Sequence, residues 1–71
     1  YNIKNFDKAE EITKLILKKK PDDYRAIFNL GSINATKGNK ELAKKYWTEV
    51  IEKYPETEEA KQAREFLTRL K

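Results

Sequence analysis

The side chains that could do chemistry in this sequence are few. It has no His, Cys or Met, so it lacks imidazole bases, thiolate nucleophiles and soft metal ligands. Ser32 is a candidate hydroxyl nucleophile without a His or Cys beside it to activate it. Three pairs of adjacent acids remain as candidate general acids or hard-cation ligands: Asp22 with Asp23, Glu10 with Glu11, and Glu58 with Glu59. These pairs fall at expected helix starts or polar faces, where solvation and the helix dipole account for them. We therefore expect no enzyme, no cofactor and no metal site.

Basic side chains outnumber acidic ones without forming an acid-free stripe. The chain has 16 Lys and Arg against 12 Asp and Glu, a formal net charge of +4. Lysines cluster at 18–20 and along 37–45, but Glu10, Glu11, Glu41 and Glu49 interrupt the basic surface. Since a phosphate-binding surface needs a continuous basic stripe, solvated faces are favoured over nucleic-acid binding. The apolar runs are too short to span a bilayer, and the lack of Cys leaves the compartment open.

The elements that would position these side chains repeat along the chain. A shift of 34 residues sets Ala9 on Ala43, Pro21 on Pro55 and Ala26 on Ala60. Within each unit the apolar residues recur every three or four positions, which places them on one face of a helix. We expect an all-α fold of four antiparallel helices, at about 5–20, 23–37, 39–54 and 57–70. The expected buried stripes are Phe6, Ala9, Ile12, Ile16 and Leu17; Ala26, Ile27, Leu30, Ile33 and Asn34; Leu42, Ala43, Tyr46, Trp47, Val50, Ile51 and Tyr54; and Ala60, Ala63, Phe66, Leu67 and Leu70.

Polar residues and glycines mark the ends of these helices. A side-chain oxygen just before a helix can accept one of its four unpaired backbone N–H groups. The candidates for this role are Asn5, Asp22 or Asp23, Asn39 and Thr57. Gly38 suits the left-handed residue that ends a helix, and Gly31 allows two helices to approach closely.

The 34-residue helix-turn-helix period, together with several residues at fixed places, resembles the tetratricopeptide repeat. The residues that carry this resemblance are Leu30-Gly31, Gly38-Asn39, Ala43 and Pro55, with Ile27 and Trp47 at two further apolar positions. The resemblance implies one domain over 1–71: a partial repeat at 1–23, a complete repeat at 24–57 and a C-terminal capping helix at 58–71. It also implies a fragment of a longer repeat array. The helix before residue 1 would then be missing, leaving a face formed by Ile3, Ile12 and Ile16 without its partner and available for homo-oligomerisation.

The resemblance further implies where a partner binds. In this family the first helix of each pair lines the concave side of the array and holds extended peptides. Here that side would carry Arg25, Phe28, Asn29, Ser32, Ala35 and Thr36, with Phe28 and Asn29 exposed and outside the core. We expect a non-catalytic protein–protein interaction module for a peptide or partner protein. The alternative is a structural cap or self-associating segment with no ligand of its own. Trp47 is expected in the core.

Overall fold

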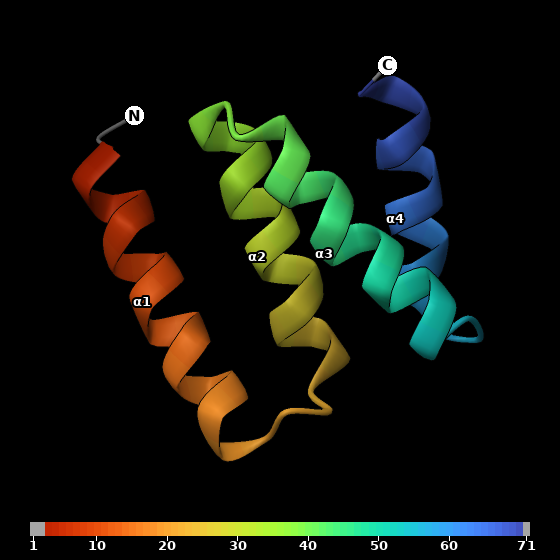
Figure 1. Ribbon diagram of the computed structural model, residues 1–71, viewed down its shortest axis with the longest axis horizontal. Helices are drawn as coiled ribbons and strands as arrows, with labels where there is room; N and C mark the ends of the chain where they lie inside the picture. Colours follow the sequence, from red (N-terminus) through yellow and green to blue (C-terminus); the bar gives the residue numbers. More distant parts are fainter. Residues whose placement is uncertain (1–2, 71) are drawn as a thin grey trace.

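The computed structural model describes residues 3–70, and the side chains of residues 5–70. The described chain folds into four α-helices without strands: α1 (Ile3–Lys19), α2 (Tyr24–Lys37), α3 (Lys40–Lys53) and α4 (Glu58–Arg69) (Figure 1). The expected all-α class is confirmed, and each helix lies within about two residues of its predicted bounds. The side chain of Ile3, which we placed on the unpartnered face, lies outside the described part.

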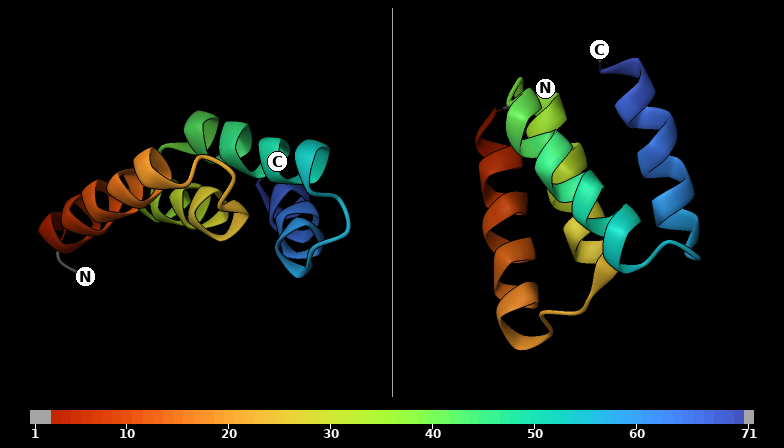
Figure 2. Two further views of the ribbon diagram at one scale, coloured as in Figure 1. Left: turned by 90° about the horizontal axis from the view of Figure 1, so that it is seen from below. Right: turned by 45° about the vertical axis from the view of Figure 1, so that its right-hand side comes forward.

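The helices are stacked in two layers. Figure 2 shows α3 on one side of the molecule, lying across α2 and α4, while α1 flanks α2 at the end of the stack. In the described part of the chain α1 contacts only α2, whereas α4 contacts both α3 and α2. We call the side on which α2 and α4 lie side by side the α2–α4 face.

Three of the expected helix-end residues act as predicted. The Asp23 carboxylate accepts hydrogen bonds from the backbone N–H groups of Arg25 and Ala26, at 3.1 and 3.3 Å. The Thr57 hydroxyl oxygen accepts from the Ala60 N–H at 3.1 Å, so α2 and α4 both begin with a side-chain cap. Gly38 ends α2 at φ 90°, in the left-handed region that glycine adopts without a steric penalty.

Two expected caps are wrong. Asn5 lies inside α1, because that helix begins at Ile3. Asn39 precedes α3, but its side chain makes no cap hydrogen bond; its amide instead donates to the Asn34 side-chain oxygen at 3.2 Å. Asn34 is fully buried and its oxygen needs a donor, which explains why Asn39 turns toward it instead.

The core consists of two small clusters that join α2, α3 and α4. One contains Ile27, Val50 and Ala60, and the other Ala43, Trp47 and Ala63. Trp47 is 3% exposed, which confirms its assignment to the core. Gly31 lies directly against it, since a Cβ at this position would overlap three atoms of the indole ring. The expected close approach at Gly31 is therefore confirmed.

Three residues expected on buried stripes are exposed. Ile12, Ile16 and Leu42 have exposed fractions of 54%, 42% and 40%. In α1 the buried position is instead Thr13, at 8%, whose hydroxyl donates to the Ala9 carbonyl at 2.7 Å. For Ile12 and Ile16 the reason is that α1 has one helical neighbour within residues 3–70, so only one side of it can be covered. The predicted open face around Ile12 and Ile16 is accordingly present.

Candidate functional site

The site with most functional potential is a small hollow on the α2–α4 face. Its volume is about 310 Å³, and three helices line it: Ser32, Ala35 and Thr36 from α2, Trp47 from α3 and Phe66 from α4. The antiparallel stacking of α2, α3 and α4 creates it, because α3 brings Trp47 in between the two helices of the face. The five lining residues, which span positions 32 to 66 of the sequence, thus surround one space.

Aromatic rings form the apolar part of this hollow. The ring centroids of Trp47 and Phe66 lie 5.2 Å apart, and Phe66 stacks on Phe28 at 5.8 Å. The indole N–H of Trp47 donates to the Phe28 backbone carbonyl at 3.2 Å, so its polar atom is already paired. Because Trp47 is only 3% exposed, most of the ring surface that the hollow offers to an apolar group of a ligand belongs to Phe66.

Two hydroxyl groups supply the polar part. The Thr36 hydroxyl donates to the Ser32 carbonyl at 3.0 Å, which leaves its oxygen able to accept from a ligand N–H. The Ser32 hydroxyl makes no hydrogen bond to any of the described residues and can both donate and accept. No titratable side chain lines the hollow. The arrangement can bind an apolar group beside a peptide amide, and it offers no acid, base or activated nucleophile for catalysis.

The structure brings three of the six residues predicted for the concave side to this hollow. Ser32, Ala35 and Thr36 line it, whereas Arg25, Phe28 and Asn29 do not. Arg25 and Asn29 are exposed, and the Arg25 guanidinium lies 3.7 Å from the Glu59 carboxylate of α4. The expectation that Phe28 stands outside the core is wrong: it is half-buried and packs against both core clusters. Because α4 covers this part of α2, the Phe28 side chain packs between the two helices.

Sequence reasoning missed Trp47 and Phe66 as residues of this site. Trp47 was assigned to the core, which is correct but incomplete, because its ring also forms part of the hollow's wall. Phe66 was placed on the buried stripe of the last helix. A signal was available: the 34-residue shift sets Phe66 on Ser32, so the two occupy equivalent places on neighbouring helices of one face.

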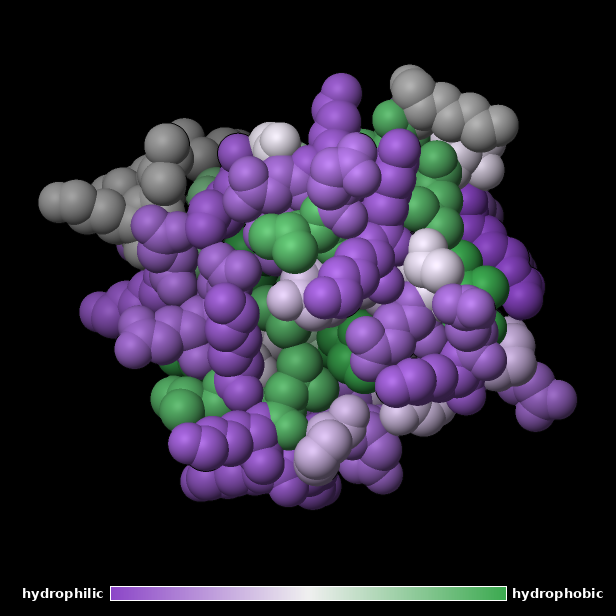
Figure 3. Space-filling view, in the orientation of Figure 1, coloured by the Kyte–Doolittle hydropathy of each residue, from purple (hydrophilic) through white to green (hydrophobic). Residues whose placement is uncertain are grey.

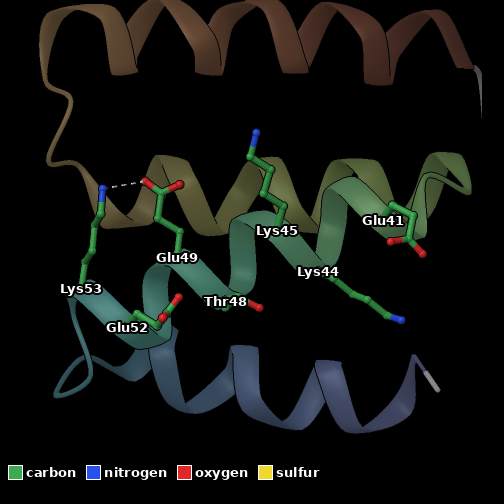
Figure 4. Close-up of a pocket in the computed structure, with 7 residues that line it drawn as sticks. All are labelled: Glu41, Lys44, Lys45, Thr48, Glu49, Glu52 and Lys53. Carbon is green, nitrogen blue, oxygen red and sulfur yellow. Dashed lines mark ion pairs between the residues drawn. The ribbon is translucent and has the colours of Figure 1, made fainter.

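A larger hollow, of about 640 Å³, lies on the outer surface of α3 and has no comparable site chemistry. All of its lining residues come from that single helix: Glu41, Lys44, Lys45, Thr48, Glu49, Glu52 and Lys53. Figure 4 shows them diverging, with Glu49 and Lys53 toward α1 and Lys44 toward α4. Glu49 and Lys53 pair at 3.5 Å one helical turn apart. Charges of both signs alternate here, as in a solvated helix face; Figure 3 shows that this side is largely hydrophilic.

A polar network holds α1 to α2 at the other side of the molecule. The Lys37 ammonium lies 2.9 Å from the Glu10 carboxylate and also pairs with Asp7. The buried Asn34 amide donates to the second oxygen of Glu10 at 3.2 Å. The hydrogen bond from Lys37, helped by that from Asn34 and by the charge of Lys14, lowers the pKa of Glu10 despite its burial. The carboxylates of Asp7 and Glu10 raise the pKa of Lys37. Every group is paired, so this network is structural.

Two kinds of site are absent from the described part of the chain. Residues 3–70 contain no cluster of three or more acidic, His or Cys side chains placed to hold a metal ion. None of the four helices, as far as the structure describes them, combines the length and the apolar character needed to cross a membrane.

The fold is that of a helical-hairpin repeat, in which paired antiparallel helices stack and leave one face open. Comparison with known families agrees with this class: residues 25–57 match the family model described as Tetratricopeptide repeat. This segment, α2 and α3 with the turns around them, therefore matches a tetratricopeptide repeat, whereas the division of the chain into a partial repeat at 1–23, a complete repeat at 24–57 and a capping helix at 58–71 stays a prediction. Neither the curated proteins nor the solved structures include a significant match.

Proposed function

We propose that this chain is a protein–protein interaction module that binds an extended peptide on its α2–α4 face, without catalysis. Tetratricopeptide repeats generally serve as protein-interaction modules and non-catalytic scaffolds. The observation that carries the proposal is the hollow itself, where the half-buried Phe66 ring and the nearly buried Trp47 ring lie beside the hydroxyls of Ser32 and Thr36. This pairing of apolar surface with hydrogen-bonding groups suits a peptide side chain and the backbone amide next to it.

The exposed side of α2 gives the length and polarity of the ligand. Arg25, Asn29, Ser32 and Thr36 follow one another at three- and four-residue spacing, so they share one side of the helix. From Arg25 to Thr36 this side is about 16 Å long at 1.5 Å per residue, which corresponds to about five residues of extended peptide. The Arg25 side of its pair with Glu59 is solvent-exposed and the separation is 3.7 Å, so the pairing is weak and a ligand carboxylate can replace Glu59. The expected ligand is a short peptide with an apolar and an acidic residue.

The test is an NMR titration of the 71-residue chain with a library of acidic-apolar peptides. Chemical shift changes should cluster at Arg25, Asn29, Ser32, Thr36 and Phe66. Filling the hollow with Thr36→Arg should weaken binding at least tenfold while leaving the helical circular dichroism unchanged, because Thr36 is exposed.

The matched control is Thr48→Arg, the same substitution at an exposed threonine on the outer surface of α3. It should leave affinity unchanged. If Thr36→Arg binds the selected peptides as tightly as Thr48→Arg does, the peptide site is not the hollow. Because Phe28 contributes to the core, its replacement cannot serve as a clean test of binding.

One observation favours the alternative, a structural cap without a ligand. The side of α4 away from the core carries only polar exposed residues: Lys61, Gln62, Arg64, Glu65, Thr68 and Arg69. A terminal helix of a repeat array needs such a surface to face water. Capping and peptide binding use opposite sides of α4, so they are compatible. The cap alone becomes the better account if no peptide of the library shifts any resonance of the α2–α4 face at millimolar concentration.

A further inference from the structure

The polar network between α1 and α2 surrounds an amide that is completely buried. Asn34 is 0% exposed, and its amide nitrogen donates to the Leu30 carbonyl at 2.8 Å and to the Glu10 carboxylate at 3.2 Å. Its oxygen accepts from the Asn39 amide at 3.2 Å. Of these partners Glu10 alone belongs to α1, and its carboxylate also accepts from the Lys37 ammonium at 2.9 Å. Position 10 of α1 is therefore the place from which that helix supplies an acceptor to two donors of α2.

Helix α1 carries two sets of residues that could lie against α2. The set on that side in the structure is Glu10, Thr13 and Leu17: the first bonds to α2, the second is buried, and the third packs against the core cluster. One residue before each of them stand Ala9, Ile12 and Ile16. A slip of α1 by one residue, which is a rotation of about 100° with a shift of about 1.5 Å, would put the second set in the place of the first.

Burial of apolar surface does not decide between these two registers. The observed register half-buries Phe6 and Leu17. The slipped register would cover Ile12 and Ile16 instead, which are 54% and 42% exposed in the structure. The two pairs of side chains are similar in size, so they contribute similarly to the hydrophobic free energy. A slip in the opposite direction does not compete, because it would turn the charged Lys14 toward α2.

The polar contacts do decide between the registers. In the slipped register Ala9 would stand in the place of Glu10, and alanine has no side-chain acceptor. The buried Asn34 amide would lose an acceptor, and the Lys37 side chain, which is 18% exposed, would lose its less exposed partner. An unpaired buried amide and an ammonium group withdrawn from water both disfavour that arrangement. Asp7, the other acid beside Lys37, is 58% exposed, so its pair contributes little to the choice.

We propose that Glu10, Asn34 and Lys37 select the register of α1 on α2, and thereby determine which apolar residues α1 turns outward. A buried polar group can fix the register of packed helices in this way, because every other register leaves it unpaired. In this chain the selected register directs Ile12 and Ile16 away from α2. The proposal concerns the α1–α2 contact alone. It is independent of what lies on the outer side of α1 and of the peptide site on the α2–α4 face.

The test removes the buried polar contact without leaving the amide unpaired. In the double variant Glu10→Ala with Asn34→Leu, alanine occupies positions 9 and 10 alike, so the two registers place the same side chain against residue 34. NMR of the full 71-residue chain should show one set of α1 resonances with NOEs between the methyl groups of Leu17 and Ile27, because these two side chains pack together. The double variant should show a second set of α1 resonances, with NOEs between the methyl groups of Ile16 and Ile27.

The matched control makes the same two substitutions at exposed positions of the same helices, Glu11→Ala with Asn29→Leu. It should keep a single set of α1 resonances. Urea unfolding separates selection of the register from simple stabilisation. Glu10→Ala alone should lower the midpoint, because the Asn34 amide loses an acceptor, and adding Asn34→Leu should raise it again. All spectra are recorded at about 0.5 M salt, which screens the exposed ion pairs of α1.

Four results would overturn the proposal. The first is a double variant with one set of α1 resonances and the unchanged contact between Leu17 and Ile27. The second is a double variant with a lower urea midpoint than Glu10→Ala alone. The third is the loss of all NOEs between α1 and α2 in the double variant, which would show that the network attaches α1 rather than selecting its register. The fourth is a second set of α1 resonances in the control variant as well.

Discussion

The contact between Gly31 and Trp47 predicts that Gly31→Ala lowers stability when Trp47 is present and raises it when Trp47 is replaced. Gly31 is helical and buried, and a Cβ at this position would overlap Nε1, Cδ1 and Cε2 of the Trp47 indole. Gly31→Ala gains about 0.8–1 kcal/mol of intrinsic helix stability. The forced displacement of the packed ring costs about 1–3 kcal/mol. The cost is the larger of the two, so Gly31→Ala should destabilise the otherwise unchanged chain by up to about 2 kcal/mol.

Removing the indole should reverse the effect. In a Trp47→Leu background the overlapping nitrogen and Cε2 are gone and the flexible leucine can turn away. Gly31→Ala should then stabilise by up to about 1 kcal/mol, the propensity difference alone. The coupling energy between the two positions should be about 1–3 kcal/mol, a size typical of residues in contact.

The assay is urea unfolding followed by circular dichroism at 222 nm, because Trp fluorescence is lost in half of the variants. The four members of the cycle are compared by their midpoints and slopes. Trp47→Leu alone destabilises the fold because it removes a large core side chain. All four proteins are therefore measured in sucrose, which favours the folded state. Additivity within about 0.3–0.5 kcal/mol, with Gly31→Ala having the same sign in both backgrounds, would refute the argument that the ring and the glycine share one space.

Three further predictions follow from the helix ends and the α1–α2 network. Gly38→Ala should cost about 1–2 kcal/mol in urea unfolding although no atom lies near the new Cβ, because the left-handed backbone at φ 90° is unfavourable for alanine; an unchanged midpoint would contradict this. Asp23→Ala should cost about 1 kcal/mol through the loss of two cap hydrogen bonds, and Asp23→Asn, which keeps the accepting oxygen, should cost less in the same assay. Because the folded pKa of Glu10 is lowered, its contribution to stability is complete above the ordinary pKa of about 4.5 and is lost as pH falls through the lower folded value. The folded pKa of Lys37 is raised, so its contribution is complete below about 10.5 and is lost as pH rises through the higher folded value. Glu10→Gln should therefore flatten the acid side of a stability–pH curve, and an unchanged acid limb in that variant would show that other groups cause it.

Patterns within single helices, together with one repeat period, were sufficient to predict most of the fold. The three- and four-residue apolar spacing determined the four helices, and the recurrence of Ala and Pro after 34 residues determined how they pair. The helix-end roles of Asp23, Thr57 and Gly38 were predictable because each role depends only on backbone a few residues away. Asn39 was not, since its side chain turns to the buried Asn34, whose need for a partner arises from packing.

The site was predictable only in part, because it depends on how far each helix is covered by its neighbours. Ser32 and Thr36 were recognised from the side of α2 on which they lie. Phe66 lies beside the hollow because α4 packs against α2 as well as α3, and the same packing draws Phe28 into the core.

What the sequence by itself determined is the class of structure: an all-α repeat unit whose helix positions follow from periodicity and end chemistry. Only the tertiary structure decided which apolar residues are covered. The stripes of α1 and α3 look alike in the sequence, yet Ile16 is 42% exposed whereas Val50, its equivalent after 34 residues, is fully buried. The physical reason is that burial is a property of pairs of surfaces. α3 lies against two helices and α1 against one, so the same apolar pattern becomes core in the first and an open surface in the second.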